Sequence, residues 1–286
     1  MSVPAPDAAE IRERERQTWS TAAAGWRTND AALIQMFGPV TEEIVRRSGA
    51  GPGMRVLDLA SGTGEPSLSL AAKVGAKGSV LGLDLAEPML EVAREKARSQ
   101  GVTNVEYRVT DIESAGLPAD AFDAATMRWG IMFLPDPVAA MRVVHRALRP
   151  GACIVLSTWG APAENPFLSI PLGVLRRYTE VPTPAPSAPG IFAFADPQRL
   201  SSTLTAAGFS GVETGRFPLR LAGFSSGRKY WEFIQGTAGP ILRLYSGLPA
   251  EVRARVDADI QAEAEKFKGT DAIEFPALPW LGWGTK

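Results

Sequence analysis

The sequence contains one cysteine and one histidine among its 286 residues. Cys153 therefore has no partner for an internal disulfide, and one cysteine with one histidine is too small a set for the usual zinc sites. We expect no metal site and a reducing, cytoplasmic location. Because Cys153 lies within an apolar run, its thiol is also expected to be inert.

An excess of charge of either sign is missing as well. Lys and Arg number 30 and Asp and Glu number 31, which gives a formal net charge of -1. Proteins that bind a nucleic-acid backbone usually carry a basic surplus, so we expect no nucleic-acid partner. No stretch approaches the roughly 20 apolar residues that a membrane-spanning helix needs. The charged first 17 residues lack the apolar core of a secretory signal, so neither a span nor a signal is expected.

The hydrophobic content is 45%, which is enough for one large domain or for a domain with a sizeable cap. Between residues 49 and 160, short apolar runs alternate with segments of helical periodicity. Strands are expected at 54–59, 79–83, 105–109, 122–127 and 152–158, and helices at 65–74, 88–100 and 137–148. This alternation predicts a parallel sheet with helices on both faces.

The flanking segments follow other patterns. Residues 1–48 predict two cap helices, at 7–28 and 29–48, the second with a break or kink at Gly38-Pro39. The proline-rich segment 161–195 predicts a lid insertion. Residues 196–286 are expected to complete the sheet with strands near 211–221 and 273–284, which flank a helical cap insertion at 225–268.

The segment DLASGTG, residues 58–64, follows the first expected strand and precedes a helix. Gly62 and Gly64 permit a tight turn and a close approach of a ligand to the backbone. The free amide groups at the start of the next helix point into the same space. Taken alone, this pattern also fits a plain strand-to-helix turn, and many nucleotide-binding turns look similar.

Polar residues follow at the ends of the next strands. Asp84 ends the second strand, where a Rossmann-type fold has a carboxylate that accepts the ribose hydroxyls. Asp111 follows the third strand and could accept a hydrogen bond from an adenine amino group, although a turn residue explains it equally well. Arg128 and Trp129 leave the fourth strand. All four positions fall at the carboxyl edge of the sheet, where open α/β sheets bind ligands.

Four stretches together resemble the class I S-adenosylmethionine-dependent methyltransferases, and within them the group of the ubiquinone/menaquinone C-methyltransferases and many small-molecule methyltransferases. They are VLDLASGTGEPSLSLA, GLDLAEPMLEVAREKA, VTDIESAGLPADAFDAATMRWGIMFLPDP and ALRPGACIVLSTW. The resemblance is firm over about residues 15–160. It implies a doubly wound, Rossmann-like α/β fold with a seven-stranded sheet, mostly parallel with an antiparallel last strand, and a helical cap.

The resemblance also implies the cofactor, S-adenosyl-L-methionine, with S-adenosyl-L-homocysteine as its product. The cofactor-binding residues it implies are Asp58, Ala60, Ser61, Gly62, Gly64, Asp84, Leu85, Met89, Thr110, Asp111, Ile112 and Arg128. Ala60 departs from the family pattern, since many relatives have glycine there.

Aromatic residues predict the acceptor pocket. Aromatic walls suit a flat or apolar small molecule such as a secondary metabolite or a quinone-like compound, although each ring could also be core between cap and sheet. The residues expected in the pocket are Trp19, Trp26, Trp129, Phe133, Phe167, Tyr178 and Tyr230. Because the sulfonium methyl is already activated, positioning can supply much of the catalysis. Candidates for direct roles are Arg128, Trp129, Tyr178 and Tyr230, whereas the sole histidine, His145, is expected to be structural.

Two alternatives stay open at this stage. An NAD(P)-dependent oxidoreductase would need a third glycine near Pro66, which is absent, and that function leaves Asp111 unexplained. A catalytically silent nucleotide-binding protein could share the same fold, because fold does not fix function. The acceptor atom, the use of a general base and a possible homo-oligomer are undetermined by the sequence.

Overall fold

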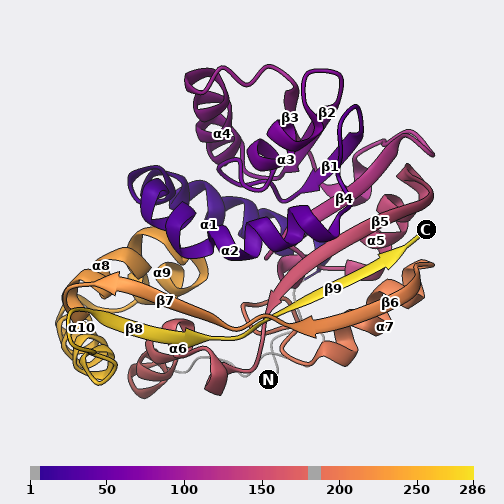
Figure 1. Ribbon diagram of the computed structural model, residues 1–286. Coiled ribbons are helices and arrows are strands. Elements are labelled where there is room, and N and C mark those ends of the chain that lie inside the picture. Colours follow the sequence, from indigo (N-terminus) through magenta and orange to yellow (C-terminus); the bar gives the residue numbers. More distant parts are fainter. Residues whose placement is uncertain (1–6, 180–187) are drawn as a thin grey trace.

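The computed structural model describes residues 7–179 and 188–286 (Figure 1). Among these residues, seven strands form one main sheet in the order β3-β2-β1-β4-β5-β9-β6. Their bounds are β1 Arg55–Leu59, β2 Ser79–Asp84, β3 Val105–Val109, β4 Phe122–Arg128, β5 Leu148–Trp159, β6 Ser210–Arg216 and β9 Pro279–Thr285. Strands β1 to β5 pair in parallel, and β9 pairs antiparallel with both β5 and β6. The predicted fold class is confirmed.

Helices cover both faces of this sheet. Along β5, Val155 packs with Ile44 in one buried cluster, whereas Ile154 and Leu156 belong to another cluster with Val144. Since successive side chains of a strand point to opposite faces, the two clusters lie on opposite sides of the sheet. The helices concerned are α2 (Asp30–Arg47) and α5 (Pro137–Ala147), and the other helices of the core are α3 (Ser67–Val74), α4 (Glu87–Ser99) and α7 (Pro197–Ala207).

The N-terminal helix α1 (Ala8–Thr28) begins where the sequence predicts. Asp7 accepts from the Glu10 amide at 2.8 Å, and Glu10 accepts from the Asp7 amide at 3.1 Å, which is a capping box. Helix α2 continues through Pro39, so of the break or kink predicted there the break is wrong. Proline removes one backbone donor, but Phe37 and Val40 on either side are buried and hold the helix against the sheet.

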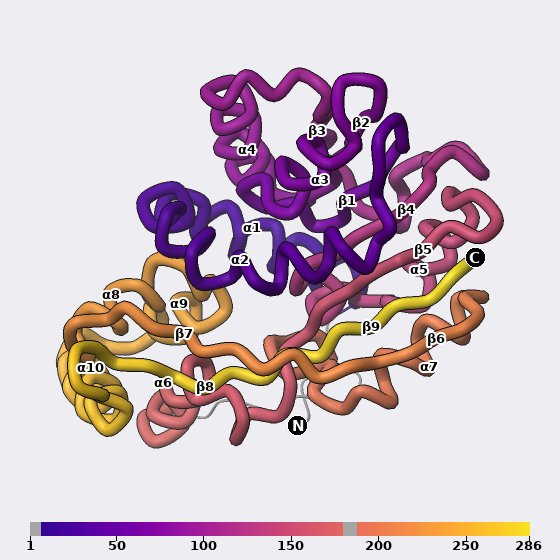
Figure 2. The backbone as a smooth tube through the Cα atoms, viewed as in Figure 1, coloured from indigo at the N-terminus to yellow at the C-terminus, as the bar shows by residue number. Residues whose placement is uncertain are grey.

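The C-terminal part differs from the prediction in its strands. Each of the two expected strands is divided: β6 is followed by β7 (Leu219–Phe224), and β8 (Ile273–Ala277) is followed by β9. Strand β7 pairs with β8 outside the main sheet. The divisions fall at Phe217-Pro218 and Leu278, and prolines 218 and 279 cannot donate to a ladder there. The two antiparallel pairs therefore form a ribbon that runs from the main sheet into the cap (Figure 2).

The residues between β7 and β8 are helical. This cap contains α8 (Gly227–Thr237), α9 (Gly239–Ser246) and α10 (Ala250–Glu265), and it packs against α6 (Pro166–Tyr178) from the predicted lid. Residues 180–187 of that lid lie outside the described part of the chain. Short 3-10 helices, η1 (Ile112–Ser114), η2 (Ile131–Phe133) and η3 (Pro162–Glu164), follow β3, β4 and β5. Within residues 7–179 and 188–286, no helix has the length and apolar character to cross a membrane.

Candidate functional site

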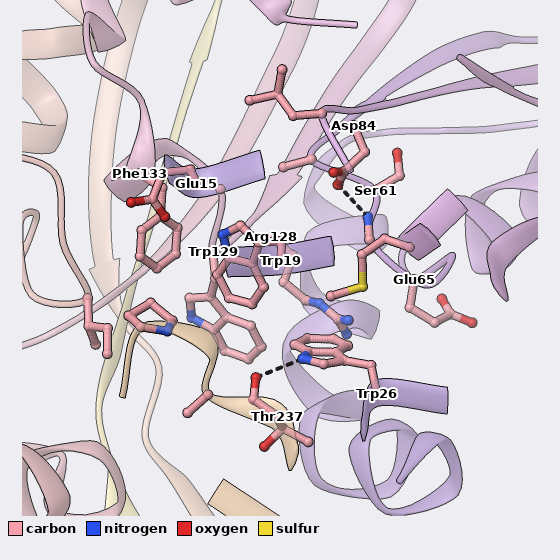
Figure 3. Close-up of a pocket in the computed structure, with 18 of the residues that line it drawn as sticks. Glu15, Trp19, Trp26, Ser61, Glu65, Asp84, Arg128, Trp129, Phe133 and Thr237 are labelled. Atoms are coloured by element: carbon pink, nitrogen blue, oxygen red, sulfur yellow. Dashed lines mark hydrogen bonds between the residues drawn. The ribbon is translucent and has the colours of Figure 1, made fainter. Parts of the chain in front are cut away.

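A pocket lies where the carboxyl ends of β1, β2, β3 and β4 meet α1 and the cap (Figure 3). Its lining combines the predicted cofactor residues with aromatic side chains from α1, the β4 end and the cap. It consists of Glu15, Trp19, Trp26, Leu33, Phe37, Ala60, Ser61, Gly62, Glu65, Leu83, Asp84, Leu85, Met89, Thr110, Asp111, Ile112, Arg128, Trp129, Gly130, Phe133, Leu134, Trp159, Phe167, Leu168, Ile191, Phe233, Thr237, Ala238 and Pro240.

The turn after β1 adopts left-handed backbone conformations at Ala60 (φ 51°) and Gly62 (φ 51°). A side chain other than glycine is strained there. The methyl group of Ala60 faces Gly130, where an added Cβ would lie 2.6 Å from the Ala60 Cβ. The absence of a side chain at Gly130 therefore makes space for the Ala60 methyl group. The alanine at position 60, where many relatives have glycine, is accommodated by this glycine on the opposite side of the pocket floor.

Asp84 connects the ends of β1 and β2. Its Oδ2 accepts from the Gly62 amide at 2.9 Å, and its Oδ1 accepts from the Ala86 amide at 2.9 Å. Burial raises the pKa of Asp84, and the backbone donors of Ala86, Gly62 and Leu85 oppose that shift. Each carboxylate oxygen can accept a further hydrogen bond. The Asp84 carboxylate, which the two backbone amides fix in place, can therefore accept hydrogen bonds from hydroxyl groups of a ligand.

The N-terminal helix closes the pocket beyond β3. Thr110, Asp111 and Ile112 line this end. The Arg12 Nε lies 2.6 Å from the Asp111 Oδ2, and its Nη2 lies 2.7 Å from the Glu113 Oε2. Arg12 was not predicted as a site residue, because in the sequence it is one of many charges at the start of a helix.

Arg128 carries a positive charge that has no ion-pair partner in the described part of the chain. Its Nη1 donates to the Thr41 Oγ1 at 2.6 Å, and among the ion pairs of the described residues none involves it. Burial lowers the pKa of Arg128, and the negative charges of Glu65, Asp58 and Asp30 oppose that shift. A guanidinium has five N–H donors, so Arg128 can bind an anionic group such as a carboxylate.

Stacked aromatic rings form the other side of the pocket. Trp129, at φ 55°, lies parallel to Trp159 with ring centroids 4.7 Å apart, and Phe37 meets it edge-on at 4.5 Å. The indole Nε1 of Trp129 is buried and has no hydrogen-bond partner in the described part of the chain. Trp19 packs on Phe133 with centroids 5.2 Å apart.

Trp26 connects the aromatic side of the pocket to the cap by a hydrogen bond. Its Nε1 donates to the Thr237 carbonyl at 2.7 Å, across 211 positions of sequence (Figure 3). Its ring meets Trp19 edge-on, with centroids 6.2 Å apart. The cap thereby shares the pocket with the first helix.

Glu15 is a pocket residue that sequence reasoning missed. It is only 6% exposed. Its Oε1 lies 3.3 Å from the Arg14 Nε, and its Oε2 is buried without a partner among the described residues. Burial raises its pKa, while Arg14, Arg243 and the Trp19 side chain oppose that shift. The available signal was its spacing of four residues from Trp19, which puts both side chains on one face of α1.

Some predicted site residues lie elsewhere. Asp58 is fully buried beneath the turn and accepts from the Thr126 Oγ1 at 2.7 Å and from the Ser67 Oγ. The hydroxyl of Tyr178 donates to Asp259 at 2.9 Å, and that of Tyr230 donates to the Phe167 carbonyl at 2.7 Å. The residues proposed from sequence that do not line the pocket are Asp58, Gly64, Tyr178 and Tyr230.

His145 is also remote from the pocket. It lies in α5, and its ring packs edge-on against Phe209 with centroids 5.0 Å apart. Burial is the largest cause that lowers its pKa. This placement agrees with a structural role.

Comparison with known proteins relates the central part of the chain to a family. Residues 50–179 match the family model of a methyltransferase domain. Over this segment the chain belongs to the methyltransferases, in agreement with the resemblance of its motifs to the class I S-adenosylmethionine-dependent enzymes. It is similar to the ubiquinone/menaquinone biosynthesis C-methyltransferase of Shewanella oneidensis, with 40% identity over 119 residues, 41% of this chain and 47% of that protein. An uncharacterized protein of Mycobacterium tuberculosis is 29% identical over 276 residues, 93% of this chain and 95% of its own length.

Solved structures share the fold of this methyltransferase. The YcgJ protein of Bacillus subtilis is 19% identical with a TM-score of 0.57, over 86% of this chain and 97% of that one. The [4+2]-cyclase SpnF is 18% identical with a TM-score of 0.54, over 100% of this chain and 99% of that one. A protein named for a cyclisation thus shares this fold, so the acceptor has to be argued from the pocket.

Proposed function

We propose that this methyltransferase transfers the methyl group of S-adenosyl-L-methionine to a small aromatic or apolar organic acceptor. The observation that carries the proposal is a single pocket that joins the carboxyl-edge residues of the sheet to an aromatic wall from α1, β4 and the cap. In Figure 3, Asp84, Ser61 and Glu65 lie on one side of this space, and Phe133, Trp129 and Glu15 lie on the other.

The pocket residues fit the methyl donor chemically. Asp84 offers free lone pairs for ribose hydroxyls, and Ile112 beside Asp111 offers an apolar contact and an acceptor for adenine. Arg128, which has no carboxylate partner among the described ion pairs, would hold the methionine carboxylate. When bound, the donor supplies a methyl group activated by a sulfonium centre. The contribution of the chain is then to hold the acceptor in line and to exclude water.

The acceptor class rests on the wall opposite the cofactor residues. Trp19, Trp129, Phe133 and Phe167 offer ring faces and edges to the space, and such walls favour a flat, apolar molecule. The Shewanella relative is named for ubiquinone and menaquinone biosynthesis, which supports a quinone-like acceptor, but it matches only 41% of this chain. The same proposal includes a cytoplasmic location, which the single cysteine supports.

Calorimetric binding of S-adenosyl-L-homocysteine and of NAD to the full chain tests the donor. We expect the first to bind and the second not to bind. Arg128→Met should weaken the binding of S-adenosyl-L-homocysteine about tenfold to a hundredfold, because a charge-assisted hydrogen bond is lost. Arg98→Met, on the outer surface of α4, is the matched control. Binding of NAD, without binding of S-adenosyl-L-homocysteine, would overturn the proposal in favour of an oxidoreductase.

A further inference from the structure

The carboxylate of Glu15 has one unpaired oxygen on the acceptor side of the pocket, among the described residues. Its Oε2 is buried without a hydrogen-bond partner in the described residues, and the side chain is 6% exposed. Glu15 lies one turn before Trp19 on α1, and the Trp19 ring packs on Phe133. It lies on the same side of the view as Phe133 in Figure 3, away from Asp84 and Glu65.

Leaving this oxygen unpaired costs free energy. A buried polar atom without a partner loses its hydration and gains nothing in return, and a charged one loses more than a neutral one. Arg14 contacts only the other oxygen, Oε1, at 3.3 Å. A ligand that donates a hydrogen bond to Oε2 would recover the cost, so this position favours a bound molecule with an O–H or N–H group.

A second unpaired atom in the same pocket narrows the chemistry of that molecule. The indole Nε1 of Trp129 is a buried donor without a partner in the described part of the chain. A hydroxyl group can both donate and accept, whereas an ammonium group only donates. Arg14 and Arg243 already place positive charge near Glu15, and Arg128 adds another at the pocket. These charges favour a neutral hydroxyl over a cationic amine.

Resting on the proposed function, we infer that Glu15 is the general base of this enzyme and that the acceptor is a small aromatic compound with a hydroxyl group. The hydroxyl proton passes to the Glu15 Oε2 while the hydroxyl oxygen forms a bond to the donor's methyl carbon. The electrons of the broken carbon–sulfur bond stay on sulfur, which gives S-adenosyl-L-homocysteine and an aryl methyl ether. The proton leaves Glu15 for solvent when the products depart.

Binding to the enzyme loaded with S-adenosyl-L-homocysteine tests the inference without turnover. The probes are 2-naphthol and 2-methoxynaphthalene, which differ in the O–H that Glu15 would accept. We expect the wild type to prefer 2-naphthol by about tenfold, as for a hydrogen bond to a charged group. Glu15→Leu should abolish this preference. Glu13→Gln is the matched control, because Glu13 lies two residues away on the exposed face and pairs with Arg16 at 2.7 Å.

A pH profile of methyl transfer to 2-naphthol separates a base from a merely structural carboxylate. Glu15→Gln should keep the binding of both ligands and lose transfer at neutral pH. It should recover transfer above the pKa of the naphthol itself, where the hydroxyl is already ionised and needs no base. Arg14 and Arg243 are the charged groups that face Glu15.

The outcomes are distinguishable. Failure of 2-naphthol to bind, an equal affinity for its methyl ether, or a preference that survives in Glu15→Leu overturns the inference while the proposed function stands. The same holds if Glu15→Gln shows no recovery at high pH. Failure of S-adenosyl-L-homocysteine to bind the wild type overturns the proposed function instead.

Discussion

At the scale of single residues, the pocket floor depends on a pair of small groups. Ala60 holds a left-handed conformation, and Gly130 lies opposite its methyl group, with space for no Cβ of its own. The sequence shows the alanine as a departure from the family pattern. It cannot show the compensating glycine, because the two positions are 70 residues apart and meet only in the folded sheet.

Gly130→Ala should therefore disturb the floor. The new Cβ would lie 2.6 Å from the Ala60 Cβ and 2.8 Å from the Met127 Cγ, and overpacking of this kind costs about 1–3 kcal/mol. We expect a corresponding loss in the free energy of unfolding in urea and weaker binding of S-adenosyl-L-homocysteine. The double variant Ala60→Gly, Gly130→Ala should regain part of both. Simple additivity of the two single variants would contradict the proposed pairing.

Asp58 predicts a specific pH dependence of stability. Burial, opposed by the hydroxyls of Ser67, Thr126 and Ser61, raises its pKa from 3.8 to about 6. The folded state thus binds the proton more tightly than the unfolded state. The stabilisation from this proton is complete below pH 4 and is lost as the pH rises through 6, by about 3 kcal/mol.

Asp58→Asn removes this titration. Relative to wild type, the variant should gain about 3 kcal/mol of unfolding free energy between pH 4 and pH 7, since it never buries the charge. Urea unfolding across this range measures the difference. Asp271→Asn, at an exposed aspartate, is the control. Parallel curves for wild type and Asp58→Asn would refute the shift.

At the scale of elements, α1 is the piece that closes the site from both ends. Arg12 pairs with Asp111 beyond β3, and Trp26 donates to the cap. Between them, Gly25 meets α8 so closely that an added Cβ would lie 1.9 Å from the Gly236 carbonyl oxygen. The sequence predicts the helix and its cap residue, because both are local. Its partners come from distant segments, so its role as a cover could not be predicted.

Gly25→Ala and Gly38→Ala form a matched pair of helix substitutions. An added Cβ at Gly38 meets nothing within 4 Å, so alanine should stabilise α2 by up to about 1 kcal/mol. The same change at Gly25 should destabilise the protein and speed the release of S-adenosyl-L-homocysteine, because α1 must move away from α8. Thermal unfolding and stopped-flow dissociation measure the two effects. Equal stabilisation by both changes would show that α1 does not rest on α8.

The strands of the C-terminal part show where local patterns fail. The sequence pattern predicts one strand over residues 211–221 and one over 273–284. In the structure each of these segments contributes strands to two different sheets. The alternation of apolar and polar residues indicates which side chains face the core, but it does not indicate which sheet a strand joins. The strand ends of the first four strands were predictable, because each is marked by a polar residue after an apolar run.

At the scale of the whole molecule, cap and sheet share one hydrophobic core. A single buried cluster extends from Leu57 in β1 to Phe275 in β8 and Ile260 in α10. The ribbon of β6 to β7 and β8 to β9 runs through both parts (Figure 1). The motifs of the sheet could be recognised singly, whereas the aromatic pocket exists only when this core is assembled.

Because cap and sheet share this core, a destabilising substitution in the cap should also destabilise the sheet. Tyr230 is fully buried in the cap, and its hydroxyl donates to the Phe167 carbonyl at 2.7 Å. Tyr230→Phe leaves that carbonyl unpaired, which should cost about 1–3 kcal/mol. If cap and sheet unfold together, as their shared core implies, the exchange of backbone amide hydrogens should accelerate by a similar factor in α10 and in β4. Tyr178→Phe, at a half-buried hydroxyl bonded to Asp259, should change exchange far less. Acceleration confined to α10 would show instead that the cap opens on its own and that the pocket can lose its aromatic wall while the sheet stays folded.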